Sequence, residues 1–130
     1  MYIIAQKKKL VYLACPYSHT DIRVRKEREH ISTRIASHLM RTHGVLVFSP
    51  LTGNCPIENC PVNPVVTGQI TYEDWMEIDL RILSVCNEMY ILAIDGWRES
   101  RGVKEEIEFC KKHKIPIYEI YLDHNNDSIR

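Results

Sequence analysis

Short, almost continuous apolar runs alternate along this chain with longer segments in which apolar residues recur every three or four positions. The length and composition of the short runs predict β-strands at residues 10–14, 45–48, 89–94 and 115–121. The spacing in the longer segments predicts amphipathic helices at residues 21–42, 70–86 and 100–113. Strands and helices are therefore expected to follow one another in regular alternation.

This alternation is typical of a parallel sheet, because parallel neighbours need a crossover between them. The second and third runs are apolar almost throughout, as expected for strands that are covered on both faces. Right-handed crossovers then give a small doubly wound α/β domain, flavodoxin-like or Rossmann-like, with four to five strands and helices on both faces. Ligands of such sheets bind beyond the carboxyl ends of the strands, where the strand order reverses.

The length of 130 residues predicts a single domain spanning residues 1–130. Residues 1–8 are expected to form an N-terminal arm, and residues 123–130 a polar tail. Residues 49–69 contain four prolines and two glycines, and no helical period is evident, so a long loop is expected there. A loop of this length is often functional or mobile.

Charge and hydropathy exclude several classes of protein. The 17 basic and 17 acidic residues give zero formal net charge, which argues against binding to duplex nucleic acid through bulk phosphate attraction. No apolar stretch approaches the roughly 18 residues of a membrane span, and no secretory leader is evident, so no membrane association and a cytoplasmic location are expected.

The five cysteines are odd in number and scattered, which does not suggest a disulfide framework. Cys55 and Cys60 have four residues between them within the predicted loop, and no second pair of zinc ligands stands nearby. No metal and no cofactor are therefore expected.

Two carboxylates lie on or beside the apolar faces of predicted helices. Glu106 lies roughly 60° from the middle of the face that contains Val103 and Cys110. Asp79 lies near the middle of the face of helix 70–86, within about 40° of Trp75. A buried carboxylate is paired, protonated or catalytic. Two of them suit cleavage of a glycosidic bond, although structural ion pairs produce the same pattern.

The start of the last helix has the features of an anion site. Ser100 is suited to cap the helix, and Gly102 permits a ligand to approach the backbone closely. Trp97, just before them, is expected either to stack on a base or to cover the sheet edge.

The first helix carries several basic residues near its N-terminus, where a cation opposes the helix dipole. Arg23 is therefore a candidate for binding a phosphate group. Arg25, Lys26 and Arg28 are interpreted instead as a solvated face. Tyr12, near the carboxyl end of the first strand, is either part of the core or a hydrogen-bond partner of the glutamate.

Taken together, three segments resemble the nucleoside 2-deoxyribosyltransferase superfamily. They are Tyr12-Leu13-Ala14-Cys15-Pro16-Tyr17-Ser18, Asp79-Leu80, and Ser100-x-Gly102-Val103-x-x-Glu106. The resemblance covers residues 10 to about 121, and is closer to a poorly characterised branch with the string Gly-Trp-x-x-Ser-x-Gly-Val-x-x-Glu, here residues 96–106. That superfamily includes transferases that exchange bases and hydrolases that cleave nucleosides or their 5′-monophosphates.

The resemblance implies that Glu106 is the nucleophile that attacks C1′, that Asp79 is the acid that helps the base to leave, and that Tyr12 contacts the nucleophile. The monophosphate hydrolases tend to carry serine six residues before the nucleophile, as Ser100 stands here, which favours a nucleoside 5′-monophosphate substrate. Pro16, Tyr17 and Ser18 are expected to bind substrate, although this loop departs from the glycine-containing versions. A homodimer or higher homo-oligomer is also implied.

Two other functions are compatible with the sequence. One is a glycohydrolase that acts on a dinucleotide such as NAD. The other is a nucleotide-binding or sensor protein without turnover. Free nicotinamide would identify the first, and ligand-induced stabilisation without product would identify the second.

Overall fold

The computed structural model describes residues 7–63, 65, 66, 68–125 and 129 of the chain. Within these residues a four-stranded sheet has the order β2-β1-β3-β4, and every neighbouring pair is parallel. The strands are β1 (Leu10–Ala14), β2 (Leu46–Phe48), β3 (Glu88–Leu92) and β4 (Ile117–Ile120). The strand order reverses between β1 and β3, so the expected binding position lies beyond the carboxyl ends of these two central strands.

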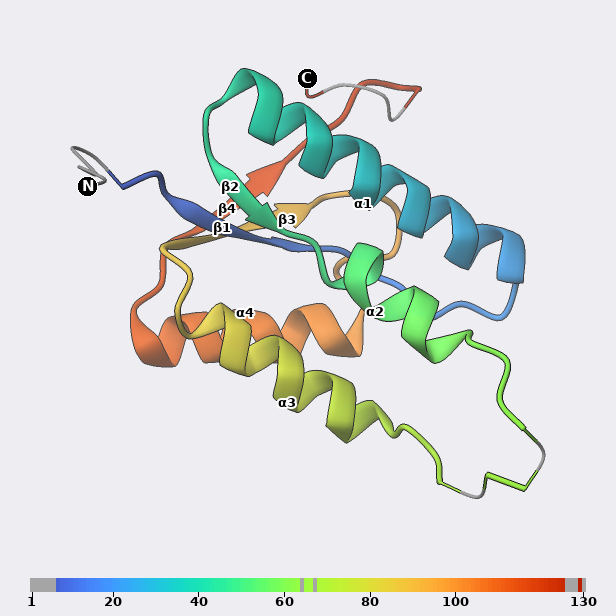
Figure 1. Cartoon of the computed structure of the whole chain (residues 1–130). Helices are drawn as coiled ribbons and strands as arrows, with labels where there is room; N and C mark the ends of the chain where they lie inside the picture. Colours follow the sequence, from blue (N-terminus) through green and yellow to red (C-terminus); the bar gives the residue numbers. More distant parts are fainter. Residues whose placement is uncertain (1–6, 64, 67, 126–128, 130) are drawn as a thin grey trace, which may run out of the picture.

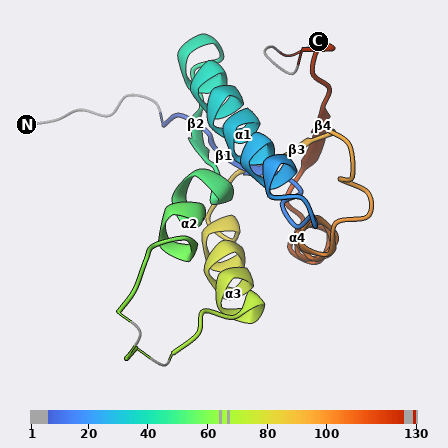
Figure 2. The ribbon, with the colours of Figure 1, turned by 90° about the vertical axis from the view of Figure 1, so that its right-hand side faces the viewer.

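Helices cover both faces of the sheet (Figure 1). They are α1 (Ile22–Thr42), α2 (Pro50–Glu58), α3 (Tyr72–Leu83) and α4 (Arg101–His113). Helix α1 covers one face, and α3 and α4 run along the other (Figures 1 and 2). The short α2 packs against α1 near the carboxyl end of the sheet. This architecture confirms the predicted doubly wound α/β fold.

The period of two along β1 divides the hydrophobic core into two layers. Tyr12 and Ala14 belong to the cluster that also contains Leu83, Met89, Val103 and Cys110. Leu13 belongs to the opposite cluster, with Ile31, Ile35, Leu39 and Leu92. Because Tyr12 and α4 share one layer, the strand directs the tyrosine side chain toward the helix that carries Glu106.

Side-chain caps define where three of the helices begin. Asp21 accepts a hydrogen bond from the backbone N–H of Arg23 at the start of α1. Thr71 and Asp74 form a reciprocal capping box at the start of α3. Ser100 caps α4, as its position in the sequence predicts.

The prediction of an unbroken loop over residues 49–69 is wrong in its first half. Helix α2 begins at Pro50, a position where proline suits a helix because the first N–H has no partner there. Leu51 and Cys55 are four residues apart, and both are buried. These two positions span one helical turn and form the only apolar repeat in α2. A repeat this short does not predict a helix from the sequence when two prolines lie beside it.

Smaller differences concern helix faces and chain ends. Ile78, which the helical period of residues 70–86 predicts on the apolar face, is 43% exposed. Cys86, expected on that helix, lies beyond its end and is still buried. The predicted N-terminal arm and polar tail fall partly outside the described residues, at positions 1–6, 126–128 and 130. Among the described residues, no helix combines the length and apolar character that crossing a membrane requires.

Candidate active site

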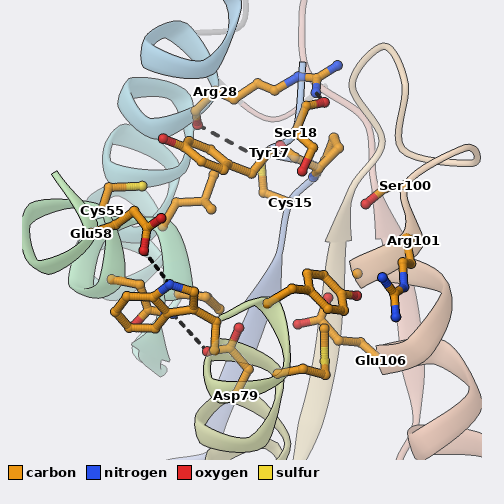
Figure 3. Close-up of a pocket in the computed structure, with 18 of the residues that line it drawn as sticks. Cys15, Tyr17, Ser18, Arg28, Cys55, Glu58, Asp79, Ser100, Arg101 and Glu106 are labelled. Atoms are coloured by element: carbon orange, nitrogen blue, oxygen red, sulfur yellow. Dashed lines mark hydrogen bonds between the residues drawn. The ribbon is translucent and has the colours of Figure 1, made fainter. Parts of the chain in front are cut away.

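A pocket of about 800 Å³ opens beyond the carboxyl ends of β1 and β3 (Figure 3). Its walls come from the segment after β1, from α2 and α3, and from the start of α4. This volume falls in the range of small-molecule sites. Among the predicted site residues, those that line it are Pro16, Tyr17, Ser18, Asp79, Ser100, Gly102 and Glu106.

Glu106 lies on the inner side of α4 and is only 5% exposed. The hydroxyl of Tyr12 donates a short hydrogen bond to its Oε2 atom. Burial raises the pKa of Glu106 to about 8 because the charged form is poorly solvated there, and repulsion from Asp79 adds to the rise. The hydrogen bond from Tyr12 opposes this shift, since it stabilises the carboxylate.

Asp79 lies on the buried side of α3 and is 8% exposed. The amide of Asn54 in α2 donates a hydrogen bond of 2.9 Å to its Oδ1 atom. Burial raises the pKa of Asp79 to about 6, and the bond from Asn54 partly offsets the rise. Asp79 and Glu106 therefore enter the same pocket from two helices, each with a neutral hydrogen-bond donor as its partner (Figure 3).

Structural ion pairs, the alternative interpretation of the two carboxylates, are absent around them. None of the ion pairs between described residues includes Asp79 or Glu106. Buried carboxylates without a cation are costly to ionise. Such groups are typical of sites that move protons or bind a charged ligand.

The start of α4 forms one wall of the pocket. Ser100 Oγ accepts a hydrogen bond of 3.2 Å from the N–H of Val103, which shows that this hydroxyl caps the helix. Gly102 faces α3 across the pocket. A Cβ atom there would lie 3.6 Å from Met76 Cε and 3.8 Å from Tyr72 Oη, both ordinary contact distances. A Cβ atom at residue 102 would therefore fit beside α3, so the packing there does not by itself require a glycine.

The structure does not bring Arg23 or Trp97 to the pocket. The Arg23 side chain is 88% exposed and pairs with Asp21 at 2.9 Å, because the carboxylate that caps α1 also holds the nearby guanidinium. Trp97 packs against the core layer shared by α3 and α4, and the guanidinium of Arg98 lies 4.7 Å from the centre of its ring. Of the two roles expected for Trp97, the structure shows the one of covering the sheet.

Arg28 was expected on a solvated face of α1, and this prediction is wrong. Arg28 is 8% exposed and lines the pocket. Its guanidinium donates hydrogen bonds of 3.0 Å to the carbonyl oxygens of Ser18 and Asp95. These carbonyls belong to segments that follow β1 and β3, so only the folded chain provides the environment that buries this side chain.

The sequence predicts a loop where α2 lies, so it does not indicate the pocket residues that this helix contributes. Asn54 and Glu58 come from α2, and the indole N–H of Trp75 donates a hydrogen bond of 2.5 Å to Glu58 Oε2. Tyr72 was also missed. Its hydroxyl donates to Glu105 at 3.0 Å, and the guanidinium of Arg101 lies 4.1 Å from the ring centre. Trp75 was visible in the sequence one helical turn before Asp79.

No group of three or more histidine, cysteine or acidic residues suited to a metal ion occurs in the described part of the chain. Cys55 is buried in α2, whereas Cys60 is exposed, and all five cysteines are free thiols. Cys15 lines the pocket, and burial raises the pKa of its thiol to about 12.

The model of a protein family described as a domain of unknown function, DUF1937, matches residues 9–121. The chain belongs to this family. The matched range contains every strand and helix described above and all the residues that line the pocket. No curated protein matches the chain.

Two solved structures share the fold of this DUF1937 protein. A conserved protein from Enterococcus faecalis V583 is 18% identical, with a TM-score of 0.57, over 91% of this chain and 66% of that one. A 2-deoxyribosyltransferase from Bacillus psychrosaccharolyticus is 19% identical, with a TM-score of 0.54, over 86% of this chain and 72% of that one. The chain thus spans about two thirds of the length of the first of these structures. At such identities the likeness establishes the fold.

Proposed function

We propose that this protein cleaves the N-glycosidic bond of a nucleoside or, more specifically, of a nucleoside 5′-monophosphate. The acceptor is water in a hydrolase or a second base in a deoxyribosyltransferase. The observation that carries the proposal is the placement of two buried carboxylates, Glu106 and Asp79, in one pocket without cation partners. The fold shared with a 2-deoxyribosyltransferase supports it.

The reaction proceeds by double displacement. An oxygen of Glu106 attacks C1′ of the sugar, and the bond between C1′ and the base nitrogen breaks. Asp79 gives its proton to the departing base, which leaves a glycosyl ester on Glu106. The acceptor then attacks C1′, Asp79 takes the acceptor's proton, and the carboxylate of Glu106 is released. Every atom and proton is accounted for without a cofactor.

Tyr12 supports Glu106 as the nucleophile. Its hydroxyl donates to the carboxylate before the attack, which fixes one oxygen and stabilises the charge. Asn54 holds Asp79 in a similar way and keeps it directed into the pocket. Tyr17, Tyr72 and Trp75 provide aromatic surface for the base within the same walls.

The protonation states have a direct consequence for this mechanism. Catalysis requires ionised Glu106 and protonated Asp79, whereas the pKa of Glu106 lies near 8 and that of Asp79 near 6. The single proton of the pair therefore resides mainly on Glu106, so the productive form is the less populated one. The positive charge that develops at C1′ in the transition state favours ionised Glu106 over its protonated form.

The central test is a panel of nucleosides and 5′-monophosphates, incubated with and without an acceptor base, with free base as the readout. Wild-type protein is expected to release base, and Glu106→Gln to release at least about 1000-fold less, since the covalent step is lost. Glu108→Gln, an exposed change on the same helix, is the matched control. Equal release by Glu106→Gln and wild type would exclude the proposed nucleophile.

The same incubations separate the other two functions. Nicotinamide released from NAD, with no base released from nucleotides, would indicate a dinucleotide glycohydrolase. Thermal stabilisation by nucleotides with no product from any substrate, retained in Glu106→Gln, would indicate a binding protein. The predicted homo-oligomer is checked on the same preparation by light scattering.

A further inference from the structure

Arg28 places a buried cation in the wall of the pocket. The residue is 8% exposed, and no ion pair between described residues includes it. Its guanidinium partners are two neutral carbonyl oxygens, those of Ser18 and Asp95. A buried charge of this kind is normally matched by an opposite charge, and none of the ion pairs within the described ranges provides one.

The two carbonyl bonds leave part of the guanidinium available. Arginine has five N–H donors, and the hydrogen bonds to Ser18 and Asp95 use one at each terminal nitrogen. The same bonds hold the plane of the group in a fixed orientation. An arginine that is already oriented loses little conformational freedom when it binds an anion through its remaining donors.

Backbone geometry beside Arg28 preserves this position. Gly96 has a φ of +90°, a conformation that favours glycine. A Cβ atom at residue 96 would lie 2.6 Å from Arg28 Nη2, too close for the guanidinium to stay where it is. The turn after β3 therefore leaves room for this side chain.

The charges of the pocket are separated in space. Figure 3 shows Arg28 and Ser18 at one end, and Asp79 and Glu106 at the other, with Ser100 along the wall between them. An elongated substrate with an anionic group is oriented by this arrangement. The anion is drawn to Arg28, and the opposite end is placed at the two carboxylates.

We propose that Arg28 binds the phosphate of the substrate and thereby selects phosphorylated over unphosphorylated nucleosides. The inference rests on the proposed function for the identity of the substrate, and it assigns the specificity to one residue. A phosphate monoester at the 5′ position satisfies the free guanidinium donors and neutralises the buried charge. Ser18 lies at the Arg28 end of the pocket and Ser100 along its wall, and both supply neutral hydroxyls.

The test compares kcat/KM for a nucleoside 5′-monophosphate with kcat/KM for the same nucleoside. In Arg28→Gln this ratio is expected to fall about 10- to 100-fold, the effect of removing a hydrogen bond to a charged group. The change should appear in KM of the monophosphate, with kcat little altered. Because both substrates meet the same protein sample, the ratio does not depend on the fraction of folded enzyme.

Arg41→Gln is the matched control, since it removes the same charge from the same helix at an exposed position outside the pocket. It should leave the ratio unchanged. A purely structural Arg28, which only ties the two carbonyls together, would lower activity on both substrates equally. That outcome, with an unchanged ratio, would overturn the proposal.

Binding measured by calorimetry on wild-type protein covers the case in which Arg28→Gln does not fold. The 5′-monophosphate should bind at least about tenfold more tightly than the nucleoside, and inorganic phosphate should weaken its binding. Affinities within about threefold of each other would reject the role of Arg28.

Calorimetry also separates the inference from the proposed function. Arg28-dependent binding of the monophosphate without turnover would refute glycosidic cleavage and retain the phosphate site. Turnover of the monophosphate and the nucleoside with equal kcat/KM would support glycosidic cleavage and refute the phosphate site.

Discussion

Buried carboxylates at the two ends of the sheet have different kinds of partner. At the amino end, Glu88 on β3 is 6% exposed and pairs with the Lys9 ammonium at 2.5 Å. At the carboxyl end, Glu106 is 5% exposed and meets the neutral hydroxyl of Tyr12 instead of a cation. Similar burial therefore accompanies charge neutralisation in one place and a raised pKa in the other.

The two places differ in whether the buried charge has a partner within the protein. Lys9 is mostly exposed, so the chain matches Glu88 with a cation that remains largely solvated. Asp79, Glu106 and Arg28 are buried within one pocket, and none of them has an oppositely charged partner among the described ion pairs. Buried acidic and basic groups without a charged partner around one cavity are expected where a ligand binds.

A large loss of activity is also expected at the carboxyl end for Asp79→Asn. Without the acid, cleavage of an ordinary nucleotide should slow by about 100- to 10,000-fold, the usual contribution of general acid catalysis. A 7-methylguanine nucleotide carries a positive charge on its base and leaves without protonation, so its cleavage should slow far less. Rates measured on both substrates check this, and equal losses would remove Asp79 from the acid role.

Glu106→Gln should stabilise the folded protein, increasingly so as the pH rises. Folded Glu106 keeps its proton up to about pH 8, whereas the unfolded chain releases it near 4.5. Between these values the folded state binds more protons, so wild-type stability falls as pH rises, whereas glutamine does not titrate. The variant should gain roughly 2–4 kcal/mol over wild type between pH 5 and pH 8.

Urea unfolding at the two pH values measures this difference. Asp79 titrates in both proteins, so its contribution to the pH dependence of the free energy of unfolding largely cancels when the two are compared. A stability difference that does not change with pH would show that Glu106 is already ionised in the folded state at pH 5.

The pH dependence of kcat/KM should be bell-shaped in the wild type. Activity should rise about tenfold per unit below pH 6 and fall about tenfold per unit above pH 8, since only the singly protonated pair is active.

The assignment of roles is tested in Asp79→Asn with the 7-methylguanine substrate. The falling limb should disappear, because only ionised Glu106 is then required, and activity should rise toward pH 8. A profile that falls through pH 8 more than the loss of the N1 proton of the 7-methylguanine ring itself explains would assign the acid role to Glu106.

The smallest effect is expected at the amino end of the sheet. Glu88→Gln removes a pair whose lysine is 64% exposed, so the free energy of unfolding should drop by only about 1 kcal/mol. The kcat/KM of the variant should stay within about twofold of wild type. A large loss of activity would mean that Glu88, like Glu106, contributes to the pocket. The distinction between the two ends of the sheet would then not hold.

Much of the fold was predictable because its signals are local. The apolar runs predicted β1 and β3 within two residues of their ends, and the helical period predicted α1 and α4 within one residue. Helix α2 was not predicted because it has nine residues, two prolines and only one apolar turn. Its stability depends on tertiary packing, which includes its contacts with α1. Its absence from the prediction also hid Asn54 and Glu58.

The same distinction between local signals and distant packing applies to the candidate site. Periodicity alone placed Asp79 and Glu106 toward the interior, and the structure buries both of them. Two arginines of α1, Arg23 and Arg28, could not be ranked by exposure in this way. Arg23 and Arg28 are five residues apart on one helix, and their order of exposure depends on what packs beside that helix.

The sequence by itself determined the alternation of strands and helices, the cap of α4 and the inward positions of the two carboxylates, because each depends on residues close together in the chain. The tertiary structure alone decided that Tyr12 meets Glu106 across 94 positions and that Arg28 meets the carbonyl of Asp95 across 67. Charge at such sites depends on solvation and on partners brought from distant segments, and no local pattern contains either.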